Sequence, residues 1–247
     1  MDVSGLWLAG LLWSVFLGMA VGNFATNPIY RLPRNDKIFG RKPYCGDCNA
    51  ELKPRDLFPV FSWLSTGGKC RYCGASVPAQ YVLVEALVTV WFTALYIRFG
   101  FSEPFVLLSL AGTALVMLFA MEMIDRFFSH ATWISFLVLG MIYRTLQDGT
   151  IFDFLQGVLY CTIFAMAFWK WNNKRADIAS GLPDYVKLFI ASGVWFGLYD
   201  WGVWFCLVAV TITLFWIVSK TVYSRASGWP LSLAFTPAWM VVAAQLY

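Results

Sequence analysis

Charge is scarce in this sequence. Only 13% of its 247 residues are Asp, Glu, Lys or Arg, 60% are hydrophobic, and there is one histidine. The average soluble domain has about 25% charged residues. The chain also has no G-x-S-x-G, G-x-G-x-x-G or P-loop pattern, so no serine-hydrolase elbow or nucleotide loop is indicated. So apolar a chain is a poor match to nucleic-acid binding and has the composition of a polytopic membrane protein.

The apolar stretches predict eight membrane spans, because a crossing helix needs about 20 mostly apolar residues. Residues 185–219, around Asp200, also allow a different division. We therefore expect an all-α polytopic membrane protein in three parts: a first transmembrane helix (1–29), a cytoplasmic four-cysteine zinc loop (30–80) and a transmembrane core (81–247). The predicted spans are 5–29, 81–98, 104–124, 131–146, 151–169, 185–199, 202–219 and 230–246.

The basic residues predict the orientation of these spans. Segment 30–80 has nine Lys and Arg residues, and none precedes the first span. Basic residues are enriched in cytoplasmic loops, so the N-terminus is expected outside. Alternating spans then place 16 of the 18 basic residues inside and leave only Arg98 and Arg144 outside. The basic residues of 30–80 would favour anionic lipid headgroups.

Four of the six cysteines form the most specific local pattern, Cys45-x2-Cys48 and Cys70-x2-Cys73, with a 21-residue spacer. Paired thiolates at this spacing are typical of tetrahedral zinc sites. The loop is predicted to be in the reducing cytoplasm, where disulfides are rare. A closed four-thiolate site has no open position for substrate, so we expect zinc to fold the loop. Cys161 and Cys206 lie within spans and are expected to be packing residues.

Two aspartates stand at predicted span ends on the cytoplasmic side, Asp125 after 104–124 and Asp184 before 185–199. Two carboxylates close together in a low-dielectric site share a proton, so one activates water while the other hydrogen-bonds a carbonyl. Aspartic peptidases use this chemistry. The alternative is that both are solvated helix-end carboxylates. Glu122, one turn before Asp125, could tune or replace it, and Glu85 raises the same question more weakly.

The single histidine, His130, lies five residues after Asp125. A Cys/His or Ser/His/Asp hydrolase could be built around it. A lone histidine at a membrane interface is usually structural, and no nucleophile motif accompanies it. A structural role is therefore the favoured interpretation.

Several motifs occur in a fixed order: "GNFATNPIYRLP" (22–33), the four-cysteine loop with "LFPVFSWLSTGGKCRYCGASVPAQYVLVEAL", the aspartate at a span end, and "GLPDYVKLFIASG" (181–193). In this order they resemble the type IV prepilin peptidase family of pilus and type II secretion systems. The resemblance extends from residue 22 to about residue 197.

The resemblance implies an enzyme of the bacterial inner membrane with two activities. Such an enzyme removes the basic leader of prepilins or pseudopilins at the cytoplasmic face, then N-methylates the new terminus with S-adenosylmethionine. Family members without the cysteine loop are peptidases alone, so the intact cysteines favour both activities here. The substrate prepilin, the methyl-donor site and the oligomeric state are not indicated by the sequence.

The resemblance also implies roles for particular residues. The catalytic aspartates correspond to Asp125 and Asp184, the latter in the family's G-x-G-D motif beginning at Gly181. The supporting positions that match the family are Lys187, Leu188, Asn27, Arg31, Pro33 and Glu85.

The sequence departs from the family pattern at two places. Pro183 replaces the second motif glycine, and His130-Ala131 stands where an Ile/Leu-Pro pair is usual. Proline fixes φ and removes a backbone donor, which could change the turn that orients Asp184. These changes bear on the efficiency of cleavage and on the choice of substrate more than on the resemblance to the family.

Two other functions are compatible with parts of the sequence. A transporter would carry acidic residues in mid-span and often an internal repeat. Here the acids of interest lie at one predicted face, and no repeat is evident. A zinc-loop scaffold that docks pilus or secretion partners would depend on the cysteines but tolerate loss of either aspartate.

Overall fold

The computed structural model describes residues 3–40, 42–57, 61–125, 127–146 and 151–172, together with 187, 190, 191 and 193–195. These residues are helical or irregular, and they contain two isolated β-bridges but no strand. The chain divides into two compact units, Met1–Ser129 and His130–Tyr247, and each is described by itself.

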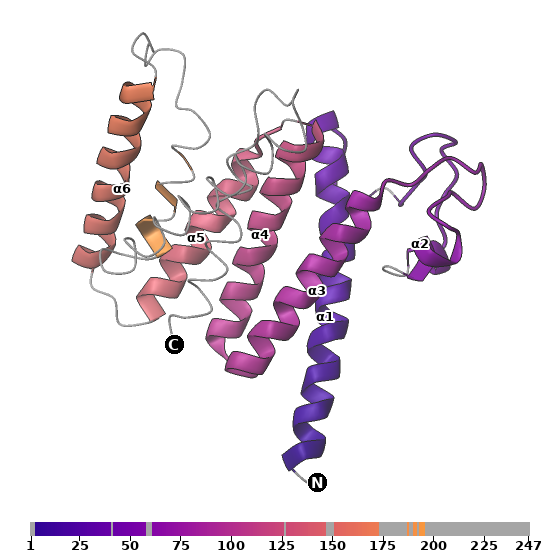
Figure 1. Cartoon of the computed structure of the whole chain (residues 1–247), viewed down its shortest axis with the longest axis horizontal. Helices are drawn as coiled ribbons and strands as arrows, with labels where there is room; N and C mark the ends of the chain where they lie inside the picture. The colour runs from indigo at the N-terminus through magenta and orange to yellow at the C-terminus, as the bar shows by residue number, and fades with distance from the viewer. Residues whose placement is uncertain are drawn as a thin grey trace, which may run out of the picture. The chain divides into compact units, whose positions relative to one another are not determined.

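Three long helices build the first unit: α1 (Val3–Arg31), α3 (Ala79–Phe99) and α4 (Glu103–Asp125). They lie side by side, with α1 packed mainly along α3 and α3 against α4 (Figure 1). The apolar residues are exposed on the outer faces of α1 and α3 and buried where the helices meet. Exposed Leu and Trp side chains on a helix surface are expected where lipid replaces water as the solvent.

Two glycines allow α1 and α3 to approach closely. A Cβ at Gly18 would lie 2.8 Å from Cα of Thr89, and one at Gly22 would lie 3.0 Å from Cα of Glu85. Glycines four residues apart on one helix face are typical of tightly packed membrane helices. The G-x3-G spacing in the sequence is a local signal of this close packing.

Three helices are long and apolar enough to cross a membrane among the residues described: Gly5–Arg34, Ala79–Phe99 and Glu103–Asp125. They coincide with the first three predicted spans. Two further predicted spans, 131–146 and 151–169, coincide with α5 (His130–Leu146) and α6 (Ile151–Asn172) of the second unit. Spans 202–219 and 230–246, and most of 185–199, lie outside the described residues.

The connection between α1 and α3 contains the cysteine-rich loop. It begins with the short helix η1 (Leu32–Arg34) and also includes η2 (Pro54–Asp56) and α2 (Phe61–Ser65). Both cysteine pairs lie in this connection, and each lies in a tight hairpin closed by one β-bridge, Tyr44↔Glu51 and Lys69↔Ser76. We call residues 43–57 and 61–77 the cysteine module.

In the second unit, Trp195 is almost fully buried at 1% exposure. Its ring stacks on Phe136 with centroids 5.3 Å apart, and its Nε1–H donates to the Phe136 carbonyl oxygen at 3.2 Å. A Cβ at Gly140 would lie 2.7 Å from Nε1 of Trp195, so only glycine leaves room for the indole there. Residues 193–195 are thereby held against α5.

Candidate functional site: a four-cysteine cluster near Asp125

The four cysteines come together as predicted. The Sγ atoms of Cys45, Cys48, Cys70 and Cys73 all lie within 4.8 Å of one another. The Sγ atoms of Cys45 and Cys73 are 3.9 Å apart. Four sulfurs around one zinc ion at about 2.3 Å lie about 3.8 Å apart in a tetrahedron. The donor set and its spacing therefore match a tetrahedral divalent metal site.

The module has two halves, the hairpin that contains Cys45 and Cys48 and the hairpin that contains Cys70 and Cys73. The two halves repeat the same backbone hydrogen bonds. In each half, the backbone N–H of the first cysteine donates to the carbonyl oxygen five residues later. The carbonyl oxygen of that cysteine accepts from the backbone N–H four residues later. The residue at that fourth position has positive φ, Asn49 at 54° and Gly74 at 75°. Each cysteine pair has a glycine nearby, Gly46 and Gly74, but in the first half the left-handed position belongs to asparagine. The repeat follows from chain geometry rather than from residue identity, which is why it was not evident in the sequence.

Two thiols of the cluster have unlike pKa values. Hydrogen bonds from the backbone N–H groups of Tyr72 and Cys73 lower the pKa of Cys70 to about 7. A backbone N–H from Ala75 lowers that of Cys73, but burial and the neighbouring sulfurs outweigh it and raise its pKa to about 12. Four thiolates at this spacing need a cation to offset their repulsion, because metal ligands must lose their protons to bind.

Asp56 organises the second half, a role that the sequence did not suggest. Its carboxylate accepts hydrogen bonds from the Tyr72 hydroxyl at 2.8 Å, from Nε of Arg71 at 3.0 Å and from the Lys53 backbone N–H at 3.1 Å. Partial burial raises the pKa of Asp56, but these three donors outweigh burial, so its pKa is lowered. Arg71 and Tyr72 lie between Cys70 and Cys73, so Asp56 fixes the loop that carries both thiols.

Arg31 organises the first half. Its side chain is 3% exposed, and its guanidinium donates to the carbonyl oxygens of Lys37 and Ile38 at 3.0 Å and of Lys42 at 3.3 Å. The guanidinium also lies over the Tyr44 ring, 5.7 Å from its centroid. Arg31 therefore ties the chain leading into the first cysteine pair to the end of α1.

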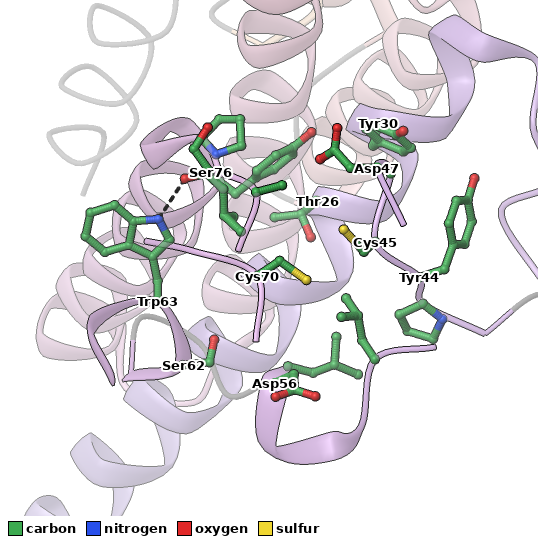
Figure 2. A pocket seen from close by; sticks show the side chains of 18 of the residues that line it. Thr26, Tyr30, Tyr44, Cys45, Asp47, Asp56, Ser62, Trp63, Cys70 and Ser76 are labelled. Atoms are coloured by element: carbon green, nitrogen blue, oxygen red, sulfur yellow. Dashed lines mark hydrogen bonds between the residues drawn. The ribbon is translucent and has the colours of Figure 1, made fainter. Parts of the chain in front are cut away.

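A cavity of about 590 Å³ lies between the module and the adjoining ends of α1 and α3 (Figure 2). The first cysteine of each pair lines it, while Cys48 and Cys73 are exposed on the module surface. Tyr30, Asp47 and Trp63 also line the cavity, with Tyr30 and Asp47 on the side of Cys45 and Trp63 on the opposite side (Figure 2). The metal site thus forms one wall of the cavity.

Asp125, the last residue of α4, is held by Arg34. Nη1 and Nη2 of Arg34 contact Oδ2 and Oδ1 of Asp125 at 3.1 and 3.2 Å. The guanidinium also lies over the Tyr30 ring at 4.2 Å and donates to the Tyr30 carbonyl oxygen at 2.7 Å. A bidentate pair fixes the carboxylate plane as well as its position. Asp125 keeps 22% side-chain exposure, so it remains accessible.

The two other candidate acidic residues of this unit differ in burial. Glu122 is half-buried one turn before Asp125 in α4. Glu85 is buried in α3 at 8% exposure, and its Oε1 accepts a hydrogen bond at 3.0 Å from the Asn23 amide, which also donates to the Leu57 carbonyl oxygen at 3.0 Å. Glu85 therefore joins α1, α3 and the module through Asn23.

The remaining predicted residues divide between described and undescribed parts. Asn27 lines the cavity. The backbone carbonyl of Lys187 accepts a hydrogen bond from Trp133 Nε1 at 2.9 Å. His130 is exposed at the start of α5. Asp184, Gly181 and Pro183 lie outside the described residues.

The fold and the site define a class: a helical protein with helices long and apolar enough to cross a membrane, whose first connection carries four thiols that could hold a metal ion. Comparison with known proteins narrows this class. The family model of the Bacterial Peptidase A24 N-terminal domain matches residues 16–99, which include α3, the whole module and most of α1.

Curated relatives extend the match over most of the chain, and all three below are named prepilin leader peptidase/N-methyltransferase. The chain is 25% identical to the one from Pseudomonas aeruginosa, covering 91% of this chain and 86% of the relative. It is 26% identical to that of Pectobacterium carotovorum, with 81% of each covered. It is 35% identical over 100 residues to that of Myxococcus xanthus, covering 39% of this chain and 30% of the relative.

The predicted resemblance to type IV prepilin peptidases is therefore confirmed: the chain is similar over most of its length to proteins named prepilin leader peptidase/N-methyltransferase. No solved structure shows significant similarity to the chain.

Proposed function

We propose that this protein is a membrane peptidase that removes the leader peptide of prepilins or pseudopilins and then N-methylates the new terminus. The observation that carries the proposal is the position of Asp125. It stands at the end of an apolar helix, accessible and held bidentately by Arg34, in a chain similar over 91% of its length to a prepilin leader peptidase/N-methyltransferase.

In the proposed mechanism Asp125 and Asp184 act as a pair that shares one proton. One carboxylate takes a proton from water as the water oxygen attacks the scissile carbonyl carbon. The other carboxyl group gives its proton to the carbonyl oxygen. When the C–N bond breaks, the leaving amine receives a proton from the pair. Arg34 is a positioning residue that orients Asp125 toward the reacting water.

The proposed membrane arrangement has eight spans in the bacterial inner membrane, with the N-terminus outside. It divides the chain into a first transmembrane helix (1–29), a cytoplasmic zinc loop (30–80) and a membrane core (81–247). The support is the distribution of basic residues and the apolar helices described above. The basic leader of the substrate would then meet Asp125 at the cytoplasmic face, while its apolar helix partitions into the bilayer.

In this proposal a structural zinc ion is held by Cys45, Cys48, Cys70 and Cys73. Four thiolates close the coordination shell, so the metal contributes folding energy rather than a reactive water. Methylation requires S-adenosylmethionine as co-substrate, as the name of the relatives' second activity implies.

The proposal is tested with purified protein in lipid nanodiscs and a prepilin from the same organism, with cleavage followed on gels. Asp125→Asn and Asp184→Asn are each expected to reduce cleavage by at least about a thousandfold, because each removes a proton-transfer group. Glu122→Gln is expected to cleave. The matched control is Glu103→Gln, an exposed carboxylate at the opposite end of α4.

Near-normal cleavage by either Asp variant would show that the proposed pair is wrong. Loss of cleavage in Glu122→Gln with retention in Asp125→Asn would move the catalytic role to Glu122. If the unaltered chain does not cleave any prepilin, the peptidase proposal itself fails and a scaffold or transporter function takes its place.

A further inference from the structure

We infer that the cavity between the cysteine module and the ends of α1 and α3 is the binding site for the methyl donor, S-adenosylmethionine. The inference rests on the proposed methyltransferase function. Its volume of about 590 Å³ lies within the range of about 300–1,000 Å³ that is usual for sites of small organic ligands. The cavity is thus large enough for a nucleoside joined to an amino acid.

Most charged side chains of the cavity wall already have partners. Arg31 is bound by backbone carbonyls, Arg34 by Asp125, and Arg71 by Asp56. Asp47 and Lys69 also line the cavity, and neither side chain has a hydrogen bond or ion pair with any residue that the structure describes. The cavity therefore offers one free carboxylate and one free ammonium group, which are complementary to the amino and carboxylate groups of a free amino acid.

The remaining chemistry of the wall suits the rest of the donor. Tyr30, Trp63 and Tyr81 provide aromatic rings, on which a flat adenine can stack. Cys45 and Cys70 form the metal-side wall. Four thiolates around one divalent ion keep two net negative charges, and an ion's own charge dominates the local field. A positively charged sulfonium is favoured beside such a wall.

The cavity also adjoins the proposed peptidase site. Ile124, which precedes Asp125 in α4, and Arg34, which binds Asp125, both line the cavity. The amine released by cleavage would form close to the methyl donor. Its nitrogen lone pair attacks the methyl carbon, the carbon–sulfur bond breaks and leaves its electron pair on sulfur, and a proton passes from nitrogen to water. The products are the N-methylated terminus and S-adenosylhomocysteine.

The test is binding of S-adenosylmethionine, measured by calorimetry on the zinc-loaded full chain in nanodiscs. Asp47→Asn and Lys69→Met are each expected to weaken binding about tenfold, as for loss of a charge-assisted hydrogen bond. The matched controls are Glu51→Gln in the module and Lys42→Met just before it, which change one carboxylate and one ammonium that pair with each other outside the cavity. They are expected to leave binding within twofold.

Two further measurements guard against misfolding. Zinc content should remain one ion per chain in all four variants. On the unaltered chain, ultraviolet cross-linking of donor labelled in its methyl group should map to peptides that contain Tyr30, Trp63 or Tyr81. Cross-links confined to other segments, or unchanged affinity in both Asp47→Asn and Lys69→Met, would overturn the inference.

Absence of donor binding by the unaltered chain would also overturn the inference. Prepilin cleavage by the same preparation then distinguishes the two proposals. Cleavage without donor binding leaves a peptidase and removes the methyltransferase, whereas donor binding with cross-links elsewhere leaves both activities and removes only this site.

Discussion

The two halves of the cysteine module have the same internal hydrogen bonds and unlike attachments. Each half holds a tyrosine hydroxyl on an aspartate, Tyr44 on Asp36 at 2.9 Å and Tyr72 on Asp56 at 2.8 Å. The first half is tied to α1, through Arg31 and through Gly46, whose Cβ would lie 2.7 Å from the Tyr30 hydroxyl.

The second half is attached to the module's own short helices instead. Asp56 belongs to η2, and Trp63 of α2 donates from Nε1 to the Val77 carbonyl oxygen at 2.9 Å. The C-x2-C spacing accounts for the backbone hydrogen bonds that the halves share. The flanking residues account for their different attachments. The first half attaches the module to α1, and the second half packs against the module's own helices η2 and α2.

The largest expected effect comes from removing one thiolate from either half. Cys45→Ser and Cys70→Ser should each weaken zinc binding by more than about a hundredfold, a larger loss than that of an outer-shell partner. Competition with a chelating dye measures this affinity. If the halves contribute equally to the site, the two losses agree within about threefold. Tight zinc binding by either variant would contradict a four-thiolate site.

A smaller effect should separate the halves. Asp56→Asn removes a carboxylate with three donors, one of them Arg71, and should weaken zinc binding about 10–100-fold. Asp36→Asn is the matched change for the first half, because Asp36 precedes the module and accepts the Tyr44 hydroxyl. Arg31 holds the same chain segment independently, so the loss of zinc affinity should stay below about fivefold. The same chelator competition measures both. Equal losses would show that the attachment of the first half to α1 does not stabilise it.

A loss smaller than that of Asp56→Asn is expected at the left-handed position Gly74. Gly74→Ala should cost about 1 kcal/mol, or about five- to tenfold in zinc affinity, because an L-residue with a Cβ is strained at positive φ. No atom lies within 4 Å of a Cβ at Gly74, so the cost comes from the backbone alone. Gly74→Asn should recover about half of this loss, since asparagine occupies the equivalent position 49. Equal affinities for Gly74→Ala and Gly74→Asn would contradict this account.

Among the described residues, the sequence predicted the five long helices and the clustering of four cysteines. Long apolar runs ended by polar residues gave bounds within a few residues for α1, α3, α4, α5 and α6, because burying the backbone in lipid requires a continuous helix. The C-x2-C spacing predicted the cluster because it lets one turn present two sulfurs to one ion.

The contacts between distant segments could not be predicted from local pattern. Nothing near Asp56 in the sequence marks Arg71 and Tyr72 as its partners. The Arg34–Asp125 pair joins residues 91 positions apart, and a single sequence does not encode such a pairing visibly. The spacing of Gly18 and Gly22, by contrast, is a local signal for the close packing of α1 and α3.

The close approach of Gly22 to Glu85 has a consequence for the order of assembly during synthesis. These residues flank the entire module, so α1 and α3 can pair only after the chain between them has been made and gathered. Loop closure costs more entropy for a longer free chain, and a metal-ordered module shortens the free chain between the two glycine-lined faces. A cell short of zinc would thus be expected to accumulate chains whose first two membrane helices are inserted but unpaired, and these are substrates for membrane quality control.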